Sequence, residues 1–372
     1  MQRWSDKETL FLKELRENLK TEIADACQGA DVIGDRRLLR FARGHSFVMP
    51  TVVKYIKMHL AWRKSAKADD ARNNILFNGI DHPTKFPYAE IVLEHVKQGF
   101  TWTGRDKKGS PISVEKYGFD PTTVLALISI DQYMEFMIYS LEYKMMVCEQ
   151  LAEVEERAYL KSMEMKIADG TITDEERATP YGRVIYTAVI RDIGGVGMSH
   201  MGTNGQTIIS AVLRVSSDNY PELMKKCYMI NTPWVFDTIW WFIKGMLSQR
   251  TIDKVSVVGV DYKDTLLNDI TVENLPAVID GGELKPEGAF EFKPEYFKLG
   301  SGEGGCSGEG GCSGTDGNND VDEEVTIKLT EIRITDTSTT TTTTTTTNSD
   351  GDTSSSVFTN IESSVESAVD DK

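Results

Sequence analysis

The sequence predicts an α/β fold, in which a helical N-terminal lobe precedes a mostly parallel sheet covered by helices. Three observations predict it. Apolar positions in roughly the first 80 residues recur at helical spacing. Between residues 184 and 258, short β-rich segments alternate with helix-length segments, as parallel strands alternate with crossover helices. These strand segments are apolar on both faces, so we expect helices to cover both faces of the sheet.

The N-terminal lobe should contain several short helices. Leu10 to Ile23 has its apolar residues on one helical face. Two further helices are predicted at Arg36 to Ala42 and at Val52 to Arg63, and Pro50 lies near the start of the second, where helices tolerate proline. We therefore expect a lobe built only from helices.

After Gly109 the apolar period changes from helical to alternating. The predicted elements in chain order are a strand at Ile112 to Tyr117, helix at Val124 to Asp169 with a break near Ile130, a surface loop at Asp169 to Gly182, a strand at Val184 to Arg191, a helix at Gln206 to Ser217, and strands at Lys226 to Ile230 and Val255 to Val258. This alternation is the basis for the parallel sheet.

Trp234 to Leu247 is a helix-length segment with apolar residues on nearly every face and only two charges, Asp237 and Lys244. An ordinary surface helix has one apolar stripe. The segment is too short to span a bilayer, which needs about 20 apolar residues. Either its aromatic residues fill a solid core, or the helix is a lid over an apolar cavity. Gly245 and the following Ser-Gln-Arg-Thr would suit a hinge.

The net charge of −16 is concentrated in a tail. Residues 300–372 contain 15 acidic and 3 basic residues, which leaves the remainder nearly balanced. This argues against nucleic-acid binding, which requires a basic face. The tail also holds a Gly-rich duplication and a threonine run from Thr339 to Thr347, so we expect disorder beyond Leu299. At Val325 to Ile334 we expect a short peripheral element, such as an isolated strand pair, with disorder as the alternative. The expected divisions are 1–85, 86–298 and 299–372.

The sequence favours a soluble protein of a reducing, cytoplasmic compartment. Its five cysteines are scattered, and its N-terminus is charged throughout and lacks the apolar core of a signal peptide. No later segment qualifies as a membrane span. We therefore expect at most a peripheral association with membranes.

Catalytic motifs are absent from the sequence. The glycines after Asp192 fail the dinucleotide fingerprint, because His200 stands where a glycine is required. There is no phosphate-binding loop, no nucleophile elbow and no HExxH motif, and the five histidines have no metal-ligand spacing. We predict a protein that is not an enzyme and that has no catalytic residues, no metal site and no cofactor.

An ordered set of motifs spans residues 35 to 285. It comprises LLRFARGHSF (Leu38 to Phe47), Trp62-Arg63-Lys64, GRDKKGSPISVEKYG (Gly104 to Gly118), RDIGGVG (Arg191 to Gly197), YPE (Tyr220 to Glu222), NTPWVF (Asn231 to Phe236), TIDKVSVVG (Thr251 to Gly259) and LPAVIDGGEL (Leu275 to Leu284). This set resembles the CRAL-TRIO family of lipid-binding domains, and within it the secretory phosphatidylinositol-transfer branch. Under this resemblance, residues 1–85 are the family's helical N-terminal lobe and 86–298 its lipid-binding domain.

The resemblance implies a mobile aromatic gate helix over an apolar lipid cavity. It also implies which residues meet the lipid. Lys254, Thr251 and Glu222 occupy the family's head-group positions, while His45 and Ser46 stand where the family has an Arg-Lys pair. The implied gate and cavity residues are Trp234, Phe236, Ile239, Trp240, Phe242, Ile243, Trp102, Thr187 and Val189.

The family's choline site is altered in this sequence. Its two tyrosines align with Trp102 and Ser113, and its serine and threonine with Thr187 and Val189. An aromatic face still suits a quaternary ammonium, but Ser113 and Val189 remove groups that would hold the phosphate. We therefore predict that phosphatidylcholine is not the main cargo.

The sequence also suggests structural roles for two arginines and one aspartate. Arg40 and Arg43 on the LLRF helix either form ion pairs between the lobes or make an exposed basic face. Asp192 is expected to cap the glycine turn that follows it.

The resemblance therefore favours lipid binding and transfer between membranes, with a phosphatidylinositol or a related phospholipid as cargo. Two alternatives stay open. One is a lipid-sensing interaction module in signalling or membrane trafficking, whose acidic, threonine-rich tail would suit phosphorylation. The other is a carrier of an isoprenoid or sterol-like ligand. Expected partners are membrane lipids and a transient membrane surface, with trafficking or signalling proteins under the second reading, and no nucleic acid.

Overall fold

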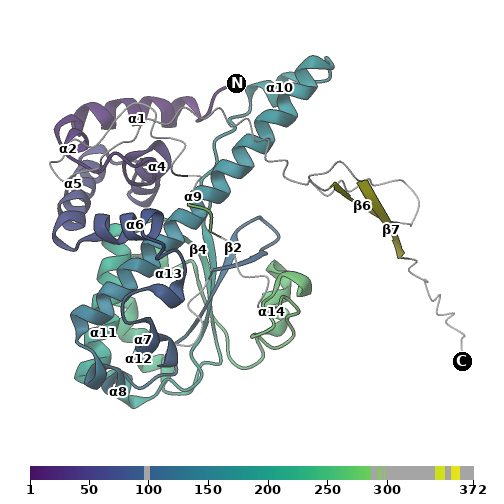
Figure 1. The fold of residues 1–372 in the computed structure, drawn as a ribbon. Helices are drawn as coiled ribbons and strands as arrows, with labels where there is room; N and C mark the ends of the chain where they lie inside the picture. The colour runs from purple at the N-terminus through teal and green to yellow at the C-terminus, as the bar shows by residue number, and fades with distance from the viewer. Residues whose placement is uncertain (96–100, 286–291, 295–296, 298–339, 348–352, 361–372) are drawn as a thin grey trace, which may run out of the picture. The chain divides into compact units, whose positions relative to one another are not determined.

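The computed structural model of the chain describes residues 1–95, 101–285, 292–294, 297, 340–347 and 353–360, and gives only the backbone at 101–103 and in the last two ranges. The chain divides into two compact units, Met1–Ser307 and Gly308–Lys372. The first unit contains the helical lobe and the sheet (Figure 1).

Six helices form the N-terminal lobe: α1 (Asp6–Asn18), α2 (Lys20–Ala24), α3 (Ala30–Ile33), α4 (Asp35–Gly44), α5 (Met49–Ser65) and α6 (Ala68–Phe77). A capping box between Ser5 and Glu8 begins α1, because the Ser5 hydroxyl accepts from the Glu8 backbone. The helix predicted from Leu10 to Ile23 is two helices, since α1 ends at its cap residue Leu19. Leu15, Leu19 and Leu39 are fully buried between these helices and hold the lobe together.

Buried arginines tie this lobe to α9 (Ile130–Ala168), the long helix at the centre of Figure 1. The Arg36 guanidinium lies 2.8 Å from a Glu156 carboxylate oxygen, and that of Arg63 lies 2.8 Å from Glu142. Removing one partner of such a buried pair leaves an uncompensated charge, which destabilises proteins by about 3–5 kcal/mol. These pairs therefore fix the lobe on the helix that also packs on the sheet.

The sheet of the first unit has five strands in the order β1 (Thr101–Arg105), β2 (Pro111–Lys116), β3 (Thr187–Asp192), β4 (Met224–Ile230) and β5 (Val255–Val257). The β1–β2 pair is antiparallel and the other three pairs are parallel. The predicted α/β fold with a mostly parallel sheet is confirmed. The predicted strands agree in position, although β3 begins at Thr187 rather than at Val184.

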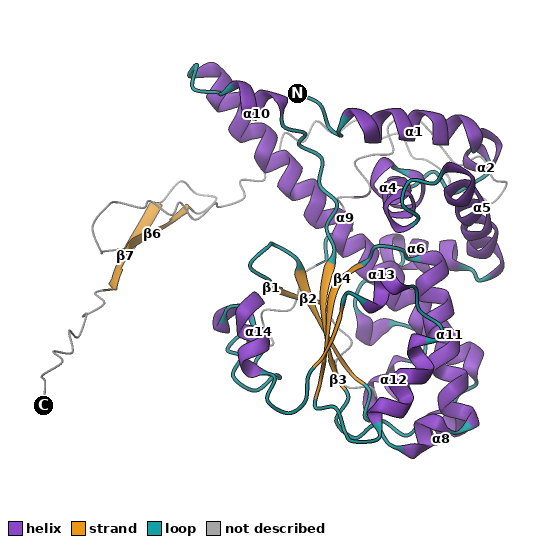
Figure 2. Ribbon diagram, turned by 180° about the vertical axis from the view of Figure 1, so that it is seen from behind, coloured by secondary structure: helices purple, strands orange, loops and turns teal. Residues whose placement is uncertain are grey.

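Helices cover both faces of the sheet, as predicted (Figure 2). One face packs against α14 (Lys263–Asp269) and the segment after it. The other face lies under α8 (Pro121–Leu127), α9, α11 (Thr203–Asn219) and α12 (Phe236–Lys244). The other helices that the structure describes in this unit are α7 (Ala89–His95), α10 (Asp174–Ala178), α13 (Gln249–Ile252) and the short 3-10 turns η1 (Pro83–Lys85), η2 (Met198–Met201) and η3 (Val272–Asn274).

Three local predictions differ from the structure. The loop predicted at Asp169 to Gly182 contains α10, which begins with a capping box between Thr173 and Glu176. The aromatic helix is shorter than predicted, because Trp234 and Val235 form a turn before it. In the second unit, β6 (Thr340–Thr347) pairs antiparallel with β7 (Thr353–Asn360), where disorder was expected. Threonine is β-branched and favours extended backbone.

Val325 to Ile334 lies outside the described residues, as do Cys306 and Cys312. Within the part of the chain that the structure describes, no single helix is both long and apolar enough to cross a membrane. Among the described helices, α8 and α9 meet that measure as a pair, and they are bent by 101° at their junction.

Candidate functional site

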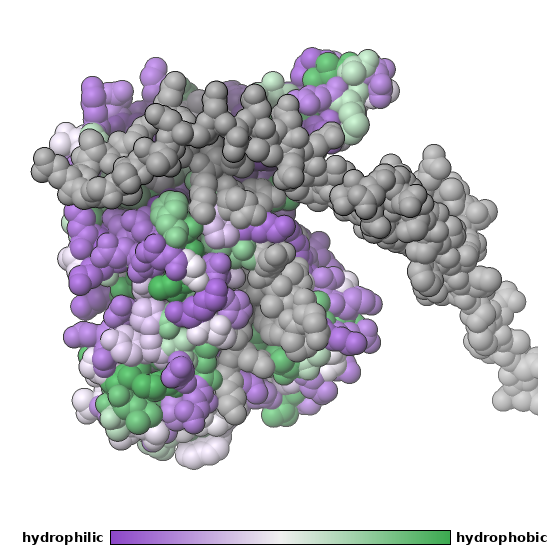
Figure 3. Space-filling model, viewed as in Figure 1, coloured by the Kyte–Doolittle hydropathy of each residue, from purple (hydrophilic) through white to green (hydrophobic). Residues whose placement is uncertain are grey.

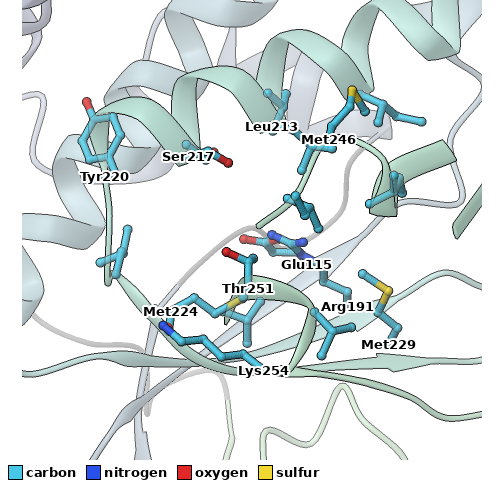
Figure 4. A pocket seen from close by; sticks show the side chains of 18 of the residues that line it. Glu115, Arg191, Leu213, Ser217, Tyr220, Met224, Met229, Met246, Thr251 and Lys254 are labelled. Carbon is cyan, nitrogen blue, oxygen red and sulfur yellow. The ribbon is translucent and has the colours of Figure 1, made fainter. Parts of the chain in front are cut away.

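A cavity of about 520 Å³ lies on the face of the sheet that α11 and α12 cover. The inner side of α12 contributes Phe236, Ile239 and Ile243, and the sheet contributes Val189 and Met229. The aromatic helix therefore covers a hollow and not a solid interior (Figure 4 shows the cavity). Most of the lining residues are apolar or aromatic, and more than a dozen are polar or charged, which suits a ligand with both an apolar and a polar part.

The aromatic helix has an inner and an outer side. Phe236 and Ile239 are buried toward the cavity, whereas Trp241 is 76% exposed on the other side. Trp234 does not face the cavity at all: it lies in the turn before α12 and is 88% exposed. A helix presents only one side to a neighbour. This explains why a segment that is apolar all round places large aromatic residues in solvent.

Two other predicted gate residues are close to the cavity without lining it. Trp240 stacks on Phe236 with ring centroids 6.2 Å apart and packs into the same apolar cluster. Phe242 is half-buried on α12 and is not among the lining residues. Neither residue forms part of the cavity wall.

Among the remaining predicted residues, Thr187 lines the cavity beside Val189. The Thr187 hydroxyl donates to the Leu223 carbonyl over 3.1 Å, so its proton is already engaged. Trp102 belongs to β1, and its side chain lies outside the described part of the chain. Ser113 is fully buried, and its hydroxyl has no hydrogen-bond partner among the described residues.

Four of the five predicted head-group residues meet at one edge of the cavity, which we call the mouth. Lys254, Thr251, Glu222 and His45 all line it. Ser46 does not: it is exposed, in a left-handed backbone conformation with φ of 53°, where the chain turns out of α4.

Glu222 is the centre of the mouth. Lys254 Nζ donates to one of its carboxylate oxygens over 3.1 Å, and Arg250 Nε donates to the other over 2.6 Å. Burial by itself raises the pKa of Glu222, but hydrogen bonds and charge from Arg250 and Lys254 outweigh it and hold the pKa below its usual value. Glu222 is therefore ionised and satisfied by two cations.

Arg250 is a mouth residue that the sequence did not single out. It lies in α13 between α12 and β5, and it lines the cavity with its guanidinium on Glu222. It restores part of the positive charge that is missing at His45 and Ser46. His45 stacks on Tyr55 at 4.1 Å, and burial lowers the pKa of its imidazole, so the ring is neutral at pH 7.

Arg40 resolves the question left open for the LLRF helix. It is completely buried and donates to the backbone carbonyl oxygens of Glu222 at 2.6 Å and Ile185 at 2.5 Å. Arg43 pairs with Glu8 at 2.7 Å and donates to the Tyr186 hydroxyl. Arg40 thus joins α4 of the lobe to the turn that carries Glu222, and the basic-face interpretation is wrong for both residues.

A second polar group lies within the cavity lining and was not predicted. Glu115 on β2 contacts Arg191 on β3 and Lys144 on α9, and all three line the cavity. Strand alternation places Glu115 and Arg191 on this face, and the parallel register pairs them directly. The signal in the sequence is that Glu115 shares its strand face with Ser113, and Arg191 shares its face with Thr187 and Val189.

Asp192, the next residue after Arg191, caps the glycine turn as predicted. One of its carboxylate oxygens accepts from the Gly194 backbone at 2.9 Å and from the Asn231 amide at 3.0 Å. Within the described residues, no group of three His, Cys, Asp or Glu side chains has the geometry to hold a metal ion.

The fold and the largely apolar cavity beneath α12 are those of a protein that binds a hydrophobic ligand. The CRAL/TRIO domain family model matches residues 95–281, which is half of the chain, so this protein belongs to the CRAL/TRIO domain family. The crystal structure of Sfh5 has the same fold: it superposes with a TM-score of 0.53 over 80% of this chain and 98% of its own, at 16% sequence identity.

Named relatives point in the same direction. The chain is 28% identical over 259 residues to the Sec14 cytosolic factor of Schizosaccharomyces pombe, covering 69% of this chain and 77% of that protein. It is 24% identical over 245 residues to the phosphatidylinositol/phosphatidylcholine transfer protein SFH12 of Arabidopsis thaliana, covering 66% of this chain but only 39% of the plant protein. These relatives are named as transfer proteins or a cytosolic factor, and not as enzymes.

Proposed function

We propose that this protein binds one phospholipid, with its acyl chains in the cavity, and transfers it between membranes as a cytoplasmic, peripherally associated protein. The observation that carries the proposal is the cavity of about 520 Å³ beneath the aromatic lid, with a charged mouth at one edge. Its family and the names of its relatives support the same activity. Phosphatidylinositol or a related phospholipid is the proposed cargo.

The mouth suits a phosphate-linked polyol. Lys254 and Arg250 supply positive charge, and Thr251 supplies a hydroxyl, which is a directed donor to phosphate oxygen. The ionised Glu222 carboxylate is an acceptor for ring hydroxyls. Lys254 and Arg250 already converge on one carboxylate, so both side chains are positioned before a phosphate arrives.

The outer side of the lid suits contact with a bilayer. Trp241 of α12 and Trp234 in the turn before it are both largely exposed, at 76% and 88%. Apolar residues also gather at the end of the molecule where α8 and α12 lie (Figure 3). Exposing acyl chains to water costs about 0.8 kcal/mol per CH₂ group. A lid that opens against a membrane avoids that exposure while the lipid moves.

The test is transfer of phosphatidylinositol from donor to acceptor vesicles. Lys254→Ala should lower the initial rate about tenfold, since hydrogen bonds to charged groups contribute roughly 1.5–3 kcal/mol. The matched control is Lys225→Ala, which removes a lysine that pairs with Asp106 at 2.9 Å and does not line the cavity. Equal rates for both variants and the unmodified chain would remove Lys254 from the site. Absence of transfer by the unmodified chain would contradict the proposed function.

The two alternatives give different results in the same experiments. A lipid-sensing module would retain lipid without moving it between vesicles. A carrier of an isoprenoid or sterol-like ligand would yield that ligand in native mass spectrometry of the purified full chain. We propose no catalytic role, and turnover of any cavity ligand by the purified protein would overturn that part.

A further inference from the structure

The charged group inside the cavity consists of Glu115, Lys144 and Arg191 and is separate from the mouth. Register pairs Arg191 with Met229, and Met229 with Val257, whereas Lys254 precedes Val255 by one residue. Three residues along the strands and two strand spacings across therefore separate the backbone positions of Arg191 and Lys254, or about 10 Å in each direction. Their charged ends are held by different carboxylates, Arg191 by Glu115 and Lys254 by Glu222.

The interior group carries a net positive charge. Lys144 and Arg191 are both cationic, and Glu115 is the carboxylate between them. Burial raises the pKa of Glu115, but the charges of Lys144 and Arg191 outweigh burial and lower its pKa far below the usual value, so it is ionised. The Tyr117 hydroxyl donates to the same carboxylate at 2.8 Å and is neutral, since burial and Glu115 raise its pKa. The sum over the group is therefore one positive charge.

That charge is presented to the cavity by Arg191. Its Nε donates to Glu115 over 2.9 Å, and its guanidinium lies 5.6 Å from the Tyr117 ring centre. Within the described residues, its two terminal amino groups make no hydrogen bond that would engage them. The side chain is 26% exposed, and Arg191 lines the cavity (Figure 4). Four N–H donors of the guanidinium are thus available to a ligand.

An unneutralised charge next to acyl chains is unfavourable, because burial of an unpaired ion is costly. Glu115 balances only one of its two cations, and of these the Arg191 side chain is the more exposed, at 26% against 10% for Lys144. A ligand group with anionic oxygens would supply both the missing charge and the acceptors, and the planar guanidinium fits carboxylate and phosphate oxygens in pairs. A choline group would meet repulsion there.

We propose that Arg191, held by Glu115, forms an interior anion-binding subsite that takes the carboxylate or phosphate of an amphiphile whose tail fills the cavity. This inference rests on the proposed function, because it names a class of cargo for the same cavity. It adds a cargo that is bound by its acidic group inside the cavity and not at the mouth.

The test uses the purified full chain and vesicles that contain phosphatidylcholine, phosphatidylinositol, phosphatidic acid and oleate in equal amounts. Lipids extracted by the protein are identified by mass spectrometry. The unmodified chain should enrich oleate or phosphatidic acid over phosphatidylcholine, and Arg191→Met should reduce that enrichment about tenfold or more. Whichever acid is enriched identifies a carboxylate or a phosphate as the natural group. Lys254→Ala should leave the enrichment intact while it weakens phosphatidylinositol loading.

The outcomes separate the two proposals. If lipid is extracted but Arg191→Met leaves the selectivity unchanged, the subsite is wrong and lipid carriage stands. If the unmodified chain extracts no lipid, the proposed function falls and the subsite with it. Arg191→Met leaves Glu115 paired with Lys144, so a folded variant is expected, which a thermal melt checks.

A second measurement does not depend on the variant folding. In the unmodified chain, NMR of bound ¹³C-carboxyl oleate or of the ³¹P nucleus of phosphatidic acid should show the acidic group still ionised at a pH where it is protonated in vesicles. An acidic group that titrates in the protein as it does in vesicles would overturn the subsite.

Discussion

The two faces of the sheet are made from alternate residues of the same strands, yet one is solid and the other hollow. On the solid face, Ile190 and Ile230 are fully buried against Leu266 of α14. On the hollow face, Val189 and Met229 line the cavity beneath α12. Ile190 and Val189 are chain neighbours, so one residue step along a strand separates a packing position from a ligand position.

The solid face contributes mainly to the stability of the fold, whereas the hollow face contributes the ligand site. Packed interiors stabilise because each side chain has close contacts on all sides, and a cavity forfeits those contacts. The hollow face is therefore held open by its surroundings: the solid face behind it, and the buried ion pairs that fix α9 and the lobe. Four expectations follow from this division.

The largest effect should come from the solid face. Ile230→Ala should lower the free energy of unfolding by about 2–5 kcal/mol, as for other fully buried aliphatic residues. Met229→Ala, one residue earlier, removes a side chain of similar size. We expect its effect to fall below that range, because one side of Met229 already faces the cavity. Chemical denaturation of both lipid-free variants measures this, and equal losses would show that the two faces are packed alike.

The second expectation concerns the joint between the lobe and the mouth. Arg40→Met leaves the carbonyl oxygens of Glu222 and Ile185 without their donors, which costs about 1–3 kcal/mol in unfolding free energy for a buried group. Because Glu222 is displaced, phosphatidylinositol transfer should fall as well. Arg43→Met on the same helix is the control: Arg43 is half-buried and touches neither carbonyl, so its effect on transfer should be small.

The sequence was sufficient for the elements and for most of the mouth. Strand alternation and helix spacing located β2, β4 and α11, and family motifs located Lys254, Thr251 and Glu222. The sequence was not sufficient to predict site residues that contact each other from distant segments of the chain. Glu115 and Arg191 are 76 residues apart, and only the register of two parallel strands brings them together.

The sequence also could not predict which aromatic side chains of this segment face the cavity and which face solvent. A segment that is apolar on all sides does not say which side faces inward, and the start of α12 at Phe236 turned Trp234 outward. Arg250 was missed for a related reason, because only the turn of α13 places it over Glu222.

The third expectation is a pH dependence of stability that arises away from the cavity. His59 is buried between the lobe and α11, where it accepts from Arg37 and contacts Asn219, both at 3.2 Å. Burial, together with the charges of Arg37 and Arg63, lowers its pKa well below the usual value. The folded protein therefore keeps His59 neutral at pH values where the unfolded chain binds a proton. Stability from this residue is complete above about pH 6.5 and declines as the pH falls, by up to about 1.4 kcal/mol per unit.

His59→Gln should flatten that decline, which denaturation at pH 5, 6 and 7 measures. His82→Gln is the comparison: partial burial and Lys85 also lower the pKa of His82, but not well below its usual value as for His59, so a smaller flattening is expected. If the His59 variant declines as steeply as the unmodified chain, the neutral buried imidazole is not the source.

The smallest effect on stability should come from the outer side of the lid, where the effect on function should nevertheless be clear. Trp241→Ser should change the free energy of unfolding by less than about 0.5 kcal/mol, since the side chain is 76% exposed. It should lower vesicle binding and transfer, because an interfacial tryptophan is lost. Leu10→Ser is a matched control on α1, with a side chain that is 68% exposed but far along the chain from the lid. Sedimentation with vesicles compares the two, and an equal loss of binding in both would mean that the lid is not the membrane-facing surface.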